Sequence, residues 1–71
     1  MRVKVSDQRR LRELLLYLRQ CGCVAEQASA NDADVYLPSV PHERGARMEL
    51  GVYLTSWSIR NEGVSAEIVE D

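Results

Sequence analysis

No run of apolar residues in this sequence approaches the roughly 20 that a membrane-spanning helix needs. The first residues, 1–5, include basic side chains, but no apolar segment follows them, so they do not resemble a signal peptide. Internal repeats and glycine- or serine-rich linkers are absent as well. A chain of 71 residues has room for one hydrophobic core, so we expect a single small domain over residues 1–71 that does not enter a membrane.

Cysteine and histidine, the soft metal ligands, are scarce. The two cysteines, Cys21 and Cys23, are separated by one residue, and a disulfide between them would be strained and close almost no loop. Free thiols are typical of a reducing compartment, so we expect a cytoplasmic protein. Neither this spacing nor the distant His42 matches the usual four-ligand zinc patterns, and we therefore expect no metal and no cofactor. Cys21 lies near the apolar face of a predicted helix, which predicts a buried, inert thiol.

Catalytic motifs are also missing. His42 lies in a polar loop, and no nucleophile elbow or other known spacing supplies it with a nucleophile. A solvated loop histidine is the simpler interpretation. The sequence therefore favours a protein that is not an enzyme, with an enzyme as the less favoured alternative.

Two arginines, Arg44 and Arg47, flank Gly45 where a second helix is expected to begin. Basic side chains at a helix N-terminus bind phosphate or carboxylate groups in many proteins. The established phosphate-binding patterns, G-x-x-x-x-G-K-[ST] and G-x-G-x-x-G, are absent. Two hypotheses stay open here: an anion site at Arg44 and Arg47, or ordinary solvated arginines.

Charge is unevenly distributed along the chain, whose net charge is −2. Residues 1–20 carry six basic and two acidic side chains, and residues 21–71 carry three basic and nine acidic ones. Such asymmetry is found in nucleic-acid-binding proteins, but here the arginines of residues 9–19 flank a leucine stripe instead of forming one patch. We therefore expect no nucleic-acid partner, and expect the two halves to neutralise each other in the fold.

Hydrophobic periodicity predicts four strands and two helices. Apolar residues alternate in the strands and recur at helical spacing in the helices. Gly22 is placed to end the first helix in a left-handed conformation. The predicted strands cover residues 2–5, 23–28, 33–37 and 64–68, and the predicted helices cover residues 7–21 and a segment from 43 or 46 to 60.

The resulting order, β-α-β-β-α-β, predicts an α+β fold of the ferredoxin-like type. This is a two-layer sandwich in which two helices cover one face of a four-stranded antiparallel sheet. Right-handed crossovers place the first and third strands in the centre. Lys4 should then lie on the open face near Glu67 and Asp34. ACT-like and heavy-metal-associated modules share this order as an analogy of fold alone, and the two-cysteine loop of the metal modules is missing.

The second helix carries more apolar residues than one face needs. Leu50, Tyr53 and Trp57 form the face expected to cover the sheet. Met48, Val52 and Ile59 form a second stripe roughly opposite to it. Leu16 and Tyr17 likewise fall outside the leucine stripe of the first helix. A stripe of this kind indicates a contact surface, unless the second helix is rotated or shorter than predicted.

These features favour a non-enzymatic protein-interaction or accessory module, most simply a homodimer, with Met48, Val52 and Ile59 as its interaction surface. The partner would be a second copy or another protein. The alternative is a regulatory module that senses a small molecule, by analogy with ACT-like domains. It would bind the ligand at a dimer interface or near Arg44 and Arg47.

Overall fold

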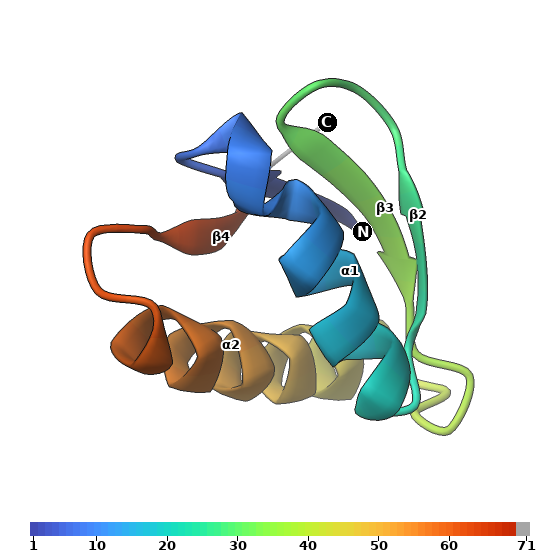
Figure 1. The fold of residues 1–71 in the computed structure, drawn as a ribbon. Coiled ribbons are helices and arrows are strands. Elements are labelled where there is room, and N and C mark those ends of the chain that lie inside the picture. Colours follow the sequence, from blue (N-terminus) through green and yellow to red (C-terminus); the bar gives the residue numbers. More distant parts are fainter. Residues whose placement is uncertain (70–71) are drawn as a thin grey trace.

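The computed structural model describes residues 1–69 and shows one antiparallel sheet with two helices on one of its faces (Figure 1). The predicted element order and the ferredoxin-like two-layer architecture are confirmed. The strands are β1 (Arg2–Val5), β2 (Val24–Gln27), β3 (Asp32–Tyr36) and β4 (Ala66–Val69). The helices are a 3₁₀ turn η1 (Gln8–Arg10), α1 (Leu11–Gln20) and α2 (Glu43–Arg60).

The strand order in the sheet is β2-β3-β1-β4, so the first and third strands are central, as expected. Each helix joins two strands that are not neighbours. Helix α1 leads from β1 past β3 to the edge strand β2, and α2 leads from β3 past β1 to the edge strand β4. Helix α2 therefore lies along one border of the helical layer, where no other element covers its outer side (Figure 1).

The charged residues of the open sheet face follow a register that differs in one respect from the prediction. Lys4 is opposite Glu67, as expected, but its partner on β3 is Asp32 and not Asp34. Asp34 is instead opposite Arg2, whose Nε donates a hydrogen bond of 2.9 Å to the Asp34 carboxylate. The difference is a shift of two residues, which keeps every side chain on its predicted face because the period of a strand is two.

Local sequence sets where the helices begin and end. The Asp7 carboxylate accepts a hydrogen bond from the backbone N–H of Arg9, so the first helix starts with a 3₁₀ turn and becomes α-helical only at Leu11. Gly22 has a φ of 91°, which confirms its predicted role after α1. The last strand starts two residues later than predicted, because the N–H of Val64 donates to the carbonyl of Asn61 in the turn that follows α2.

The hydrophobic core lies between the sheet and the two helices. Of the residues predicted to face the core, Leu50 and Trp57 are buried, whereas Tyr53 is only half-buried, and so is Ile68 because β4 is an edge strand. Leucines of α1 and the inner face of α2 meet the central strands here. The most completely buried large side chains are Val3, Val5, Leu14, Leu18, Val35 and Leu50. Among residues 1–69, no helix is long and apolar enough to cross a membrane.

Candidate interaction surface on the second helix

Helix α2 presents two apolar faces, and the fold buries only one of them. Ala46, Leu50, Leu54 and Trp57 point inward and are buried. The three residues of the predicted outer stripe are exposed: Met48 by 70%, Val52 by 64% and Ile59 by 77%. The helix therefore has the length and orientation that the sequence indicated.

Thr55 completes this surface, although the sequence analysis did not include it. It is exposed and lies between Val52 and Ile59 on the same side of the helix. With Thr55, the positions follow a spacing of four, three and four residues, which is the spacing of a helix–helix seam. Threonine is polar and so does not contribute to a pattern of apolar residues, although its spacing from Val52 and Ile59 indicates the same side of the helix. We call Met48, Val52, Thr55 and Ile59 the α2 outer face.

Three of the four residues of the α2 outer face, Val52, Thr55 and Ile59, lie in a segment without charge. No charged residue occurs from Leu50 to Ile59, on any side of the helix. Helix α1 is different, since its exposed side carries charged residues such as Arg12, Glu13 and Arg19. A helix that is hydrophobic all round is normally buried in protein. The middle of α2 thus has the composition of a buried helix and the exposure of a surface helix.

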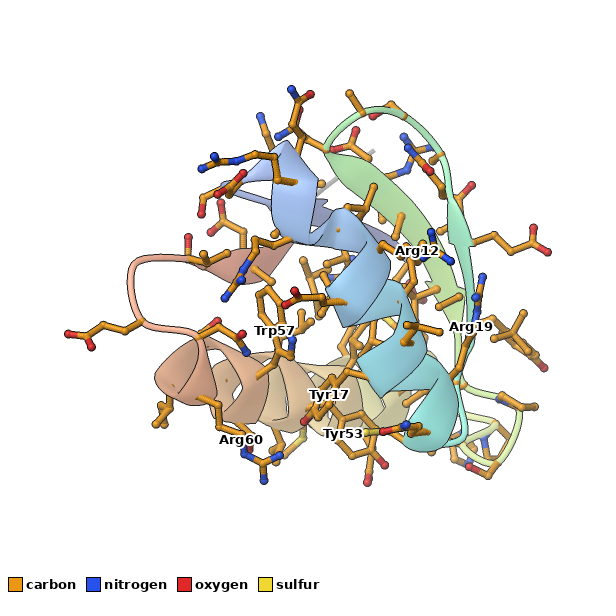
Figure 2. All side chains as sticks on the ribbon, in the orientation of Figure 1. Arg12, Tyr17, Arg19, Tyr53, Trp57 and Arg60 are labelled. Atoms are coloured by element: carbon orange, nitrogen blue, oxygen red, sulfur yellow. The ribbon has the colours of Figure 1, made fainter. Side chains whose placement is uncertain are left out.

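The Tyr17 side chain of α1 holds α2 in place by a hydrogen bond to the backbone of Tyr53 (Figure 2). The Tyr17 hydroxyl donates a hydrogen bond of 2.9 Å to the backbone carbonyl of Tyr53, and the Tyr53 hydroxyl donates one of 2.9 Å to the Glu49 carboxylate. Burial raises the pKa of Tyr17, and the hydrogen bond to Glu49 raises the pKa of Tyr53. Tyr17 falls outside the leucine stripe, a position that faces solvent in a two-layer fold, yet it is half-buried, because α2 passes close enough to accept its hydrogen bond.

The Tyr17→Phe variant is expected to lose about 0.5–1.5 kcal/mol of unfolding free energy, because it deletes a partly buried hydrogen bond between the helices. The matched control is Tyr53→Phe, which deletes only an exposed bond to Glu49 and should change stability by less than about 0.5 kcal/mol. Urea denaturation followed by circular dichroism measures both. Equal losses in the two variants would contradict this account of how the helices are held.

The other candidate residues on α2 are Arg44 and Arg47, in its first two turns. Together with Glu43 and Met48 they line an open depression at the start of the helix. Arg44 is exposed and Arg47 is half-buried. The structure thus brings the two arginines together, but the Glu43 carboxylate lines the same depression and repels an anion there.

The potential metal and redox residues do not form a common site. His42 is the N-cap residue of α2, and its exposed side chain makes no capping hydrogen bond. Both cysteines are free. Cys23 is buried, and burial raises the pKa of its thiol. Cys21 is only half-buried, contrary to expectation, since it is the C-cap residue at the outer end of α1. Within residues 1–69, no three His, Cys, Asp or Glu side chains are grouped closely enough to hold a metal ion.

Exposed apolar residues elsewhere are isolated or paired. Leu16 stands alone on α1, while Val24 and Tyr36 are opposite each other on β2 and β3, on the open face of the sheet. The sequence analysis missed this pair, although alternation within both strands places the two residues on the outward side. Neither feature extends over as many positions as the α2 outer face.

No protein-family model, no curated protein and no solved structure matches this chain.

Proposed function

We propose that this domain is a non-enzymatic protein-interaction module that forms a homodimer through the α2 outer face. The observation that carries the proposal is the exposure of Met48, Val52, Thr55 and Ile59 along one side of α2, the last three of them within a ten-residue segment that has no charge. Single exposed apolar residues are common on protein surfaces, but an ordered stripe of them marks a contact surface.

Energetics support pairing of this face. Burying apolar surface is worth about 25 cal/mol per Å². A domain of this size buries a smaller fraction of its surface than larger domains do, and additional burial in a dimer stabilises it. A second copy supplies the same apolar stripe, so the face is complementary to itself in the way that a two-fold interface requires.

Other features of the structure support a binding role over a catalytic one. The exposed His42 side chain does not cap α2, and the sequence places no nucleophile motif beside it, which supports a solvated histidine over a general base. The raised pKa of Cys23 disfavours the thiolate that reactions of cysteine need. We place the module in the cytoplasm, a reducing compartment in which its two thiols stay free.

The direct test is sedimentation equilibrium of the 71-residue chain at several concentrations. We expect a reversible increase in mass from one copy of 8.1 kDa to two copies as concentration rises. A single copy at every concentration through the high micromolar range would contradict self-association. A mixture with unrelated acidic or basic proteins serves as the control for nonspecific attraction.

A further inference from the structure

We infer that the two α2 helices of the dimer pack antiparallel about a two-fold axis, with Met48 against the partner's Ile59 and Val52 against the partner's Thr55. The inference rests on the proposed function, because it specifies how that dimer is built. It follows from the spacing of the α2 outer face, from the glycine beside its centre and from the charges at its two ends.

The spacing places all four residues on one line along the helix. Met48 and Ile59 are eleven residues apart, which turns the helix to within about 20° of the starting direction. Val52 and Thr55 lie between them on either side of the midpoint. A two-fold axis through this midpoint makes the two helices antiparallel. It places the outer residues of one subunit opposite the outer residues of the other, and the inner residues opposite the inner ones. Each Met48 then contacts an Ile59 of the other subunit, and each Val52 contacts a Thr55.

Gly51 lies beside the midpoint of the face and has no evident purpose within one subunit. A Cβ atom at this position would meet nothing within 4 Å, so neither crowding nor a positive φ requires glycine there. Glycine in the interior of a helix is less stable than alanine. A missing side chain next to Val52, near the crossing point, does, however, allow a second helix to approach closely. The position of Gly51 therefore fits a helix crossing at the midpoint.

The charges favour the antiparallel arrangement over the parallel one. Glu49 and Arg60 are exposed and eleven residues apart, which places them on the same flank of α2, and antiparallel pairing brings Glu49 of each subunit near Arg60 of the other. Arg60 extends from the end of α2 away from α1 (Figure 2). The same pairing brings Arg44 to the end of the partner helix that carries Glu62. It also opposes the two helix dipoles, whereas a parallel pair aligns them.

Cysteine cross-linking tests the arrangement. Cys21→Ser and Cys23→Ala provide a background without native thiols, and circular dichroism and sedimentation confirm that this background remains folded and dimeric. Met48→Cys and Ile59→Cys are then made separately, at exposed positions that the fold does not need. Under mild oxidation, we expect a mixture of the two variants to form a disulfide-linked mixed dimer, which mass spectrometry identifies.

Each variant alone should form no cross-linked dimer. In the antiparallel pair, two copies of position 59 are separated by eleven residues along the helix, about 17 Å, and a disulfide needs Cα atoms within about 7 Å. Parallel packing would reverse the pattern, with cross-linked homodimers of each variant and no cross-link between the two variants in the mixture. That result overturns the inference and leaves the proposed dimer intact. A dimer that forms neither kind of cross-link overturns both the antiparallel arrangement and the proposed interface, because the subunits then meet at another face. A wild type that is a monomer overturns the proposed function itself.

Discussion

Replacing Leu50 with alanine is expected to lower the free energy of unfolding by about 2–5 kcal/mol. Leu50 is completely buried between α2 and the sheet, and shortening it removes apolar contacts and leaves a cavity. Small domains have a total stability of only about 5–15 kcal/mol, so a large part of it would be lost. Urea denaturation, monitored by the fluorescence of Trp57 on the same helix, measures the change.

The matched control is Val52→Ala, two residues further along the same helix and on its opposite side. Its side chain is 64% exposed in one subunit, so the change in stability should stay within about 0.5 kcal/mol. Both variants are measured at the lowest practical concentration, where the subunits are separate. If Val52→Ala cost as much as Leu50→Ala, helix α2 would be rotated relative to the orientation described here.

The fold could be predicted because its signals are local and periodic. The leucine stripe of the first helix and the alternation in β1 and β3 each follow from the sequence within a few residues. Gly22 marks the end of α1 by its backbone conformation alone. Once the order of elements is known, the handedness of crossovers allows few topologies, and the observed strand order is the expected one.

The details that could not be predicted depend on contacts between distant segments. Tyr17 is half-buried only because Tyr53 offers a carbonyl from another helix. The partner of Lys4 on β3 depends on the register of two strands that a helix and a third strand separate along the chain. Ile68 alternates like a core residue, but its strand lies at the edge of the sheet. In each case the local pattern gave the correct face and tertiary packing decided the degree of burial.

The candidate surface combines both kinds of information. The exposure of Met48, Val52 and Ile59 was predictable, because the phase of a helix is fixed once one face is assigned to the core. A partner for these residues could not be predicted in the same way, because the helical pattern of one chain does not describe the surface of another molecule. The charges and the residue spacing around the α2 outer face are the features that favour a second copy of the chain as its partner.

The Val52→Glu variant is expected to weaken the dimer by at least about a hundredfold in Kd while the subunit remains folded. In the dimer, position 52 lies near the two-fold axis, so the substitution buries two carboxylates close to each other without a cationic partner. Burying an unpaired charge costs several kcal/mol, and about 1.4 kcal/mol corresponds to a tenfold change in Kd. In the separate subunit the same glutamate lies in water on an exposed helix face, where it costs little.

Leu16→Glu is the matched control for this variant. It also replaces an exposed aliphatic residue with glutamate, but on α1 and away from the α2 outer face. Sedimentation at several concentrations should show a dimer for the wild type and for Leu16→Glu, and a monomer for Val52→Glu, with unchanged circular dichroism in all three. Equal dissociation by both variants would mean that added negative charge, and not position 52, separates the subunits. A different result would contradict the proposal: a wild type that is a monomer together with a Val52→Glu variant that is unfolded. Val52 would then belong to the core, and the apolar face of α2 would no longer indicate a binding surface.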